Sequence, residues 1–234
     1  MQLFYTPDID SDEYTLSKDE SRHCVQVLRK KLGDTIHLID GKGGFYKASL
    51  LIDNPKSCTL KIESVNRNFG KSDVHVHIAI APTKKNERFE WFLEKATEIG
   101  INEITPIICE HSERKVLKLE RMNKILIAAM KQSQRAYLPK LNEPISFESF
   151  VTDKNNSECF IAHCKHDDEK KYLKSALNRG ANSLILIGPE GDFSSKEIEL
   201  ARKQGFSTVS LGESRLRTET AAIVSCHTIN LINQ

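Results

Sequence analysis

The sequence predicts an α/β fold in which a C-terminal parallel sheet, flanked by helices, follows a small N-terminal β-barrel. Apolar strands alternate with amphipathic helices from residue 74 onward, which is the pattern of a parallel sheet covered on both faces. Residues 1–70 instead contain short strands and turns with one short helix. The segment 66–73 between them is polar and contains Gly70, so we place a linker there and expect domains at 1–70 and 71–234.

The first part of the chain contains one predicted helix and a predicted hairpin. A helix is expected over 18–31, because Ser17 and Glu20 have the spacing of a capping box and Gly33 follows the helix end. Strands are expected over 34–40 and 45–52, joined by the glycine-rich turn 41–44. Residues 57–65 alternate between polar and apolar side chains, which predicts a half-buried strand.

The second part alternates regularly between strands and helices. Strands are expected at 74–81, 104–108, 158–163, 183–187 and 208–211. Helices are expected at 87–99, 119–137, 167–178, 194–204 and 218–232. Ser194 and Glu197 form a second capping-box pattern, and either Thr218 or Thr220 is expected to cap the last helix.

Composition excludes several classes of protein. The chain has 234 residues, a net charge of +2 and 39% hydrophobic residues, which suits one or two globular domains. Its six cysteines are scattered and form no C-x-x-C pair, so we expect a reducing, cytoplasmic location. We expect no signal peptide, because residues 1–10 have no basic region and no apolar core, and no membrane-spanning helix, because no apolar run approaches about 20 residues. No metal is expected, because the segment 163–166 (His-Cys-Lys-His) matches no common zinc spacing.

Two glycine-bearing loops near the C-terminus are the strongest functional signal. Gly188-Pro189-Glu190-Gly191 follows one predicted strand, Leu211-Gly212 follows another, and each loop leads into a helix. Two such loops close together on a parallel sheet would form a ligand pocket lined by backbone. The simpler alternative is an ordinary strand-to-helix turn. The glycine spacing fits neither a dinucleotide fingerprint nor a phosphate loop, which disfavours those ligands.

Charged residues surround the second loop. Arg215 and Arg217 precede the last helix, where two guanidinium groups beside a helix start favour anion binding. Glu219 follows within the first turn, near the positive end of the helix dipole. The alternative is a capped amphipathic helix whose charges are simply solvated.

These loops resemble those of the RsmE-type ribosomal RNA methyltransferases of the SPOUT class. The resemblance covers nearly the whole chain. It extends to Lys84-Lys85 with Arg88, to the segments 94–100 and 132–135 with Pro139, and, in the first part, to Phe4-Tyr5, His23, 27–29, Gly33-Asp34 and 40–43. The chain departs from the family pattern at Asp192, Ser214-Arg215 and Lys131.

The resemblance implies a fold, a cofactor and a substrate. The C-terminal domain would be a SPOUT-type parallel sheet with a trefoil knot, the first domain a PUA-like RNA-binding module, and the protein a homodimer. The methyl acceptor would be N3 of a specific uridine near the decoding centre of 16S ribosomal RNA, within the small ribosomal subunit. S-adenosyl-L-methionine (SAM) would be held by Gly188, Pro189, Glu190, Gly191, Leu211, Gly212, Leu216 and Arg217.

The chemistry of that reaction needs a proton acceptor and a cation. Uridine N3 carries a proton and is a poor nucleophile until it loses it. Arg217 is the candidate for stabilising the uridine anion and orienting the base. Glu190 or Glu219 would accept the proton, and the sequence does not rank them. The target base must be unpaired or flipped out, because N3 lies on its Watson–Crick edge.

Basic residues in both parts of the chain are expected to contact RNA. The phosphate backbone requires cationic surface, although a basic helix by itself is more often a solvated face. With the resemblance, we expect contacts from Arg22, Arg29, Lys30, Lys84, Arg88 and Arg135.

Two other functions stay open from the sequence. One is a non-catalytic RNA-binding ribosome-assembly factor that keeps the fold, and the other is a SPOUT methyltransferase acting on another RNA or another atom. Calorimetric measurement of SAM binding would separate an enzyme from a factor that only binds RNA.

Overall fold

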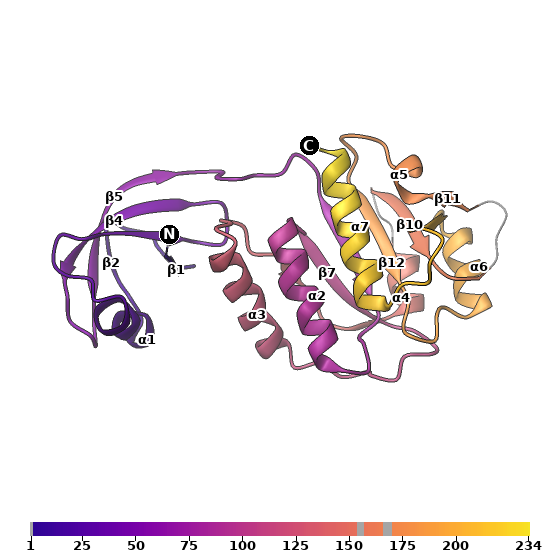
Figure 1. Ribbon diagram of the computed structural model, residues 1–234, viewed down its shortest axis with the longest axis horizontal. Helices are drawn as coiled ribbons and strands as arrows, with labels where there is room; N and C mark the ends of the chain where they lie inside the picture. Colours follow the sequence, from indigo (N-terminus) through magenta and orange to yellow (C-terminus); the bar gives the residue numbers. More distant parts are fainter. Residues whose placement is uncertain (1, 154–156, 166–169) are drawn as a thin grey trace. The chain divides into compact units, whose positions relative to one another are not determined.

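The computed structural model describes residues 2–153, 157–165 and 170–234 (Figure 1). The chain divides by its internal contacts into two compact units. The first contains the chain up to Lys71 together with Ile127–Leu138, and the second contains Ser72–Leu126 and Pro139–Gln234. Within the described residues, no helix combines the length and apolar character needed to cross a membrane.

A five-stranded sheet forms the first unit, with strand order β1-β3-β4-β5-β2. Its strands are β1 (Leu3–Tyr5), β2 (Glu13–Thr15), β3 (Thr35–Ile39), β4 (Phe45–Ile52) and β5 (Thr59–Asn66). β1 pairs with β3 in parallel and all other pairs are antiparallel. The predicted hairpin is therefore β3–β4, and its core side includes the buried Leu38, Ala48 and Leu50.

The predicted helix 18–31 is shorter and less regular than expected. Helix α1 covers Lys18–Arg22, with the Ser17 hydroxyl accepting the Glu20 N–H at its start, and a π-helical turn follows at His23–Val27. The helix ends there because Arg29 adopts a left-handed conformation (φ 55°), which no helical periodicity in the sequence signals.

The hairpin loop binds the segment that follows α3 (Leu119–Gln132). Asp40 accepts hydrogen bonds from the N–H groups of Lys42 (2.7 Å) and Gly44 (2.9 Å), which shapes the turn. Gly43 then donates to the Ala136 carbonyl oxygen at 2.9 Å. Helix α3 itself stops at Gln132 instead of the predicted Tyr137, because Gln134 takes a left-handed conformation (φ 58°). The segment 127–138 is thereby part of the first unit.

The second unit is a parallel sheet of strand order β11-β13-β10-β12-β6-β7-β8, with β9 pairing to β7. Its strands are β6 (Val76–Ile80), β7 (Glu103–Ile108), β8 (Lys140–Leu141), β9 (Ile145–Ser146), β10 (Glu158–Ala162), β11 (Lys171–Tyr172), β12 (Ser183–Ile187) and β13 (Ser207–Ser210). Its helices, besides the shared α3, are α2 (Asn86–Ile99), α4 (Phe147–Thr152), α5 (Leu173–Ala176), α6 (Ser195–Lys203) and α7 (Thr218–Ile232). The expected α/β class is confirmed.

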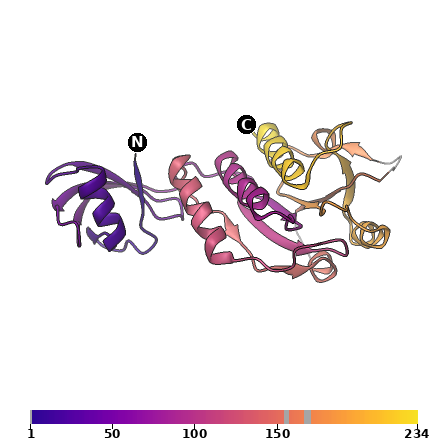
Figure 2. The same ribbon diagram turned by 60° about the horizontal axis from the view of Figure 1, so that its bottom comes forward.

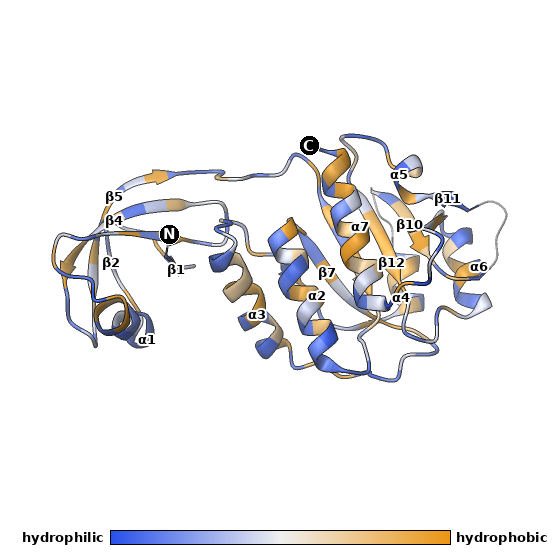
Figure 3. Cartoon of the chain, in the orientation of Figure 1, coloured by the Kyte–Doolittle hydropathy of each residue, from blue (hydrophilic) through white to orange (hydrophobic). Residues whose placement is uncertain are grey.

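Helices cover both faces of this sheet. α2 and α7 lie side by side on one face, and α4 and α6 cover the other (Figures 1 and 2). The strands between them are strongly apolar (Figure 3), and every residue of β12 is buried. Because side chains alternate across a strand, Leu184 and Leu186 pack with Phe193 on the α4–α6 side.

One predicted helix of the second unit is wrong in its described part. A helix was expected over 167–178, but residues 171–172 form the edge strand β11 and only 173–176 form a helical turn. The strand forms because Tyr172 pairs with Ser210 of β13. Residues 167–169 of that prediction lie outside the described residues.

A buried histidine in β6 gives the fold a pH dependence. His77 hydrogen-bonds Thr105 at 2.8 Å, and burial lowers the pKa of His77 from 6.5 to about 4. Between pH 6.5 and about 4, His77 is protonated in the unfolded chain but stays neutral in the folded chain. The free energy of unfolding therefore falls as the pH drops through this range. Between pH 7 and pH 5 we expect protonation at His77 to lower the free energy of unfolding by roughly 1–2 kcal/mol. Urea unfolding of His77→Gln at both pH values should show a smaller loss than wild type. Equal losses would contradict this assignment.

Candidate functional site

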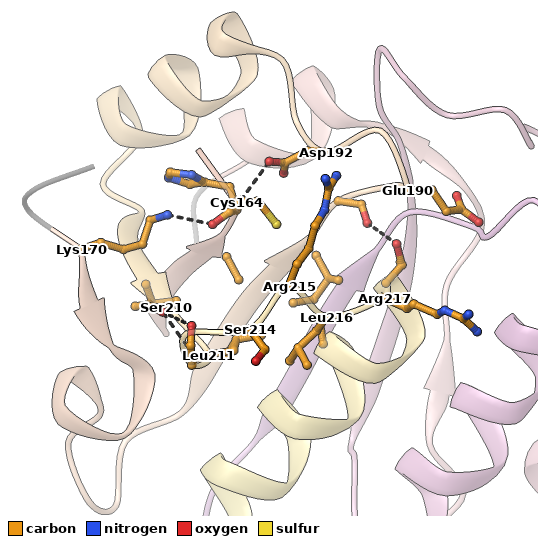
Figure 4. A pocket seen from close by; sticks show the side chains of 18 of the residues that line it. Cys164, Lys170, Glu190, Asp192, Ser210, Leu211, Ser214, Arg215, Leu216 and Arg217 are labelled. Atoms are coloured by element: carbon orange, nitrogen blue, oxygen red, sulfur yellow. Dashed lines mark hydrogen bonds between the residues drawn. The ribbon is translucent and has the colours of Figure 1, made fainter. Parts of the chain in front are cut away.

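Three loops meet at one edge of the second unit's sheet. β10, β12 and β13 are parallel neighbours, so their carboxyl ends lie together. The loops that follow them carry residues 163–165, 188–194 and 211–217. They enclose a cavity of about 580 Å³ (Figure 4), a size typical of small-molecule sites. Ligands of open α/β sheets bind at this kind of edge.

The structure brings together seven of the eight residues expected to hold a cofactor. The cavity is lined by Gly188, Pro189, Glu190, Leu211, Gly212, Leu216 and Arg217. Gly191 is not among the lining residues. A Cβ atom at Gly191 would lie 3.1 Å from the Cβ of His111, so this glycine faces the loop after β7. The part that each residue plays in binding stays a prediction.

The end of β10 forms the third wall. His163 and Cys164 line the cavity together with Lys170. His166 lies outside the described residues. The Lys170 ammonium donates to the carbonyl oxygens of His163 (2.8 Å) and Lys165 (2.7 Å), which closes this wall.

The two glycine loops are tied to each other by a buried hydrogen bond. The Thr218 hydroxyl donates to the Gly188 carbonyl oxygen at 3.0 Å. Thr218 is thus the first residue of α7 and not its cap. Arg217 occupies the N-cap position without a side-chain hydrogen bond, so the expected threonine cap is wrong. The Ser194–Glu197 capping box at α6 is confirmed.

Glu190 extends from its turn to the loop after β6. Its Oε1 accepts the Lys84 N–H at 3.0 Å, and the residue is exposed and belongs to the cavity lining. Arg114 holds the same loop by donating to the Lys84 carbonyl oxygen at 2.7 Å. Glu190 therefore has one oxygen bound to the backbone while the residue remains accessible from the cavity.

Glu219 lies in a different environment. It is only 5% exposed and does not line the cavity. Its Oε1 lies 3.7 Å from Nε of Arg88 on α2, which is an ion pair but too long for a hydrogen bond. Its buried Oε2 accepts no hydrogen bond from the part of the chain that the structure describes. Glu219 lies in the first turn of α7, near the positive end of the helix dipole.

The two arginines of the second loop point in different directions. Arg215 extends toward the turn that carries Asp192, whereas Arg217 points away from that turn (Figure 4). Both line the cavity and both are exposed. The rim of the cavity is therefore cationic on two sides, which suits an anionic substrate.

The residues expected to contact RNA are distributed over both units. Arg22, Arg29, Lys30 and Arg135 belong to the first unit, and Lys84 and Arg88 to the second. Arg22 and Arg29 are exposed, and Lys84 pairs with Glu113 at 2.8 Å. Across 2–153, 157–165 and 170–234, no cluster of three His, Cys, Asp or Glu side chains is arranged to hold a metal.

Comparison with known proteins relates both units to RNA-modifying enzymes. A family model for an RNA methyltransferase domain matches residues 70–230, and one for an RNA methyltransferase PUA domain matches residues 16–63. Ribosomal RNA small subunit methyltransferase E of Synechocystis is 32% identical over 93% of this chain and 73% of its own length. The protein of the same name from Buchnera aphidicola is 29% identical over 96% of this chain and 90% of its own.

Solved structures show the same similarity. A "probable rRNA-methyltransferase" from Porphyromonas gingivalis is 43% identical with a TM-score of 0.92, covering 99% of each chain. A methyltransferase of Legionella pneumophila, whose structure holds the cofactor SAM, is 30% identical with a TM-score of 0.87, covering 99% of this chain and 97% of its own.

Proposed function

Because the chain belongs to the family of ribosomal RNA small subunit methyltransferase E, we propose that it methylates N3 of a specific uridine near the decoding centre of 16S ribosomal RNA. It is a SAM-dependent ribosomal RNA methyltransferase. The observation that carries the proposal is the cavity formed by the two glycine loops, joined through Thr218 and Gly188.

The cavity residues fit SAM. Apolar side chains suit the adenine ring, carboxylates suit the sulfonium and ammonium groups, and cationic side chains suit the carboxylate. The lining offers all three kinds: Ile187, Val209, Leu211 and Leu216; Glu190 and Glu213; Lys170, Arg215 and Arg217. When bound, SAM supplies an electrophilic methyl group on its sulfonium.

The positions of the two carboxylates favour Glu190 over Glu219 as the proposed proton acceptor. Glu190 is exposed and lines the cavity, and its Oε1 binds the Lys84 N–H. Glu219 is buried beside Arg88 and outside the cavity lining. We therefore assign removal of the N3 proton to Glu190. We assign to Glu219 the role of holding the Arg88 guanidinium in place through their ion pair. Arg217, exposed at the rim, would stabilise the uridine anion and orient the base.

The remaining expectations belong to the same proposal. The first unit would act as the PUA-like RNA-binding part, with Arg22, Arg29, Lys30 and Arg135 contributing charge, and Lys84 and Arg88 would contact RNA near the cavity. The C-terminal segment would thread a trefoil knot, two copies of the chain would form a homodimer, and the enzyme would act in the cytoplasm.

Nucleoside mass spectrometry of ribosomal RNA tests the reaction and the target together. In a strain lacking this protein, we expect loss of one 3-methyluridine from 16S ribosomal RNA, restored by the wild-type gene. Mapping the modified fragment identifies the nucleotide. An unchanged 3-methyluridine content would contradict the proposal. SAM binding combined with loss of a different methylated nucleotide would favour a related methyltransferase, and absence of SAM binding would favour a non-catalytic factor.

A further inference from the structure

We infer that Asp192 is a positioning residue whose carboxylate holds two walls of the cavity, the loops after β10 and β12, in the arrangement that binds the methyl donor. The inference rests on the proposed function, because it concerns the same cavity. Asp192 itself lines that cavity, half-buried in the turn between β12 and α6.

The carboxylate of Asp192 joins two walls of the cavity. Oδ2 accepts the Cys164 N–H at 2.9 Å, which fixes the end of β10. Oδ1 accepts the Phe193 N–H at 2.8 Å, which fixes the turn that carries Asp192. Phe193 is completely buried in the core between the sheet and α6, so this side of the bridge is anchored. A single side chain therefore sets the separation of the loops that follow two neighbouring strands.

The main-chain carbonyl oxygen of Asp192 contacts a third loop, the one that follows β7. It lies 2.9 Å from Nδ1 of His111, which follows β7. Because a carbonyl oxygen can only accept, the imidazole donates from Nδ1. The loops after β7, β10 and β12 thus converge on one residue.

The backbone at Asp192 is held in an uncommon conformation. Its φ of 64° is left-handed, and its N–H donates to the Pro189 carbonyl oxygen at 2.9 Å to close the turn. Aspartate tolerates this region better than most residues, and glycine adopts it without strain. Glycine would relax the backbone but could not supply the two acceptor oxygens. The side chain is therefore what joins the loops.

The kinetic consequence follows from where Asp192 acts. Without its carboxylate, the exposed end of β10 at Cys164 is released from the β12 turn. Binding of the methyl donor must then order these loops, which weakens binding. Asp192 faces backbone groups and not the reacting atoms. Its removal therefore weakens binding of the methyl donor equally in the ground state and in the transition state. Such a loss raises KM and leaves kcat unchanged.

Two variants and a control test this inference. We expect Asp192→Gly to raise the Kd and the KM for SAM by about tenfold, from the loss of two hydrogen bonds, with kcat at saturating SAM close to wild type. Asp192→Asn keeps one acceptor oxygen, so its Kd and KM for SAM should lie between those of wild type and Asp192→Gly. Asp34→Asn is the matched control, because Asp34 likewise accepts a backbone N–H, from Lys31 at 3.0 Å, but in the first unit. It should leave Kd unchanged.

Amide hydrogen exchange provides a second readout, independent of turnover. The Cys164 amide should exchange faster in both Asp192 variants and remain as in wild type in Asp34→Asn. An unchanged Kd, or a lowered kcat with unchanged KM, would overturn the inference. If Asp192→Gly fails to fold, the Kd of Asp192→Asn and the exchange rate of its Cys164 amide hydrogen test the inference instead. Failure of the wild-type protein to bind SAM would instead contradict the proposed function.

Discussion

Replacing Arg217 with alanine is expected to lower kcat for methyl transfer by about 10²- to 10³-fold, the usual effect of removing a group that stabilises developing negative charge. Arg217 is exposed at the N-cap position of α7 and makes no capping hydrogen bond with its side chain. The fold should therefore survive the substitution, and the effect on SAM binding should be much smaller than the effect on kcat. Single-turnover methylation of small-subunit RNA, with calorimetry for SAM, measures both.

Arg215→Ala is the matched control for this prediction. Arg215 lines the same cavity from the same loop, but its side chain points toward the turn of Asp192 (Figure 4). Its loss should change kcat far less than the loss of Arg217. A kcat near wild type in Arg217→Ala would show that another group stabilises the uridine anion.

Glu190→Gln is expected to lower kcat at neutral pH by about 10²- to 10⁴-fold, the range for removal of a general base. Glutamine has the same shape, and its carbonyl oxygen can still accept the Lys84 N–H, so the turn should remain intact. The variant should recover activity as pH rises, because more of the target uridine then loses its N3 proton without help. Rates measured over a pH series test this recovery.

Glu219→Gln separates the two candidate bases. Glu219 is buried next to Arg88, so the neutral variant should affect RNA binding through that arginine more than the chemical step. A collapse of kcat in Glu219→Gln, with Glu190→Gln close to wild type, would reverse the two assignments.

The elements that could be predicted have strong local signals. β4, β12 and α7 have the predicted bounds, because apolar runs and periodicity define them. The helix ends at Val27 and Gln132 were placed too late. Left-handed residues other than glycine, Arg29 and Gln134, follow these ends, and no local residue pattern marks them.

The site was predictable in its position and less so in its contacts. The two glycine loops do meet, because strand order in a parallel sheet places the loop ends together. In the sequence, Asp192 stands out only as a departure from the family pattern. Its role depends on the Cys164 N–H, 28 residues away in sequence, and such long-range pairing follows from the folded backbone. The burial of Glu219 beside Arg88 also depends on a long-range contact, because Arg88 lies on α2.

The first unit is discontinuous along the chain, and this limits how the protein can be taken apart. Met130 and Ala136 pack with Leu3 and Ile39 in one buried cluster. A fragment ending at residue 70 would lack half of that cluster and expose the rest to solvent. Cleavage near the linker should therefore yield no well-folded N-terminal piece. The same restriction applies to domain exchange during evolution, since residues 1–70 cannot be replaced alone without the second segment of the first unit.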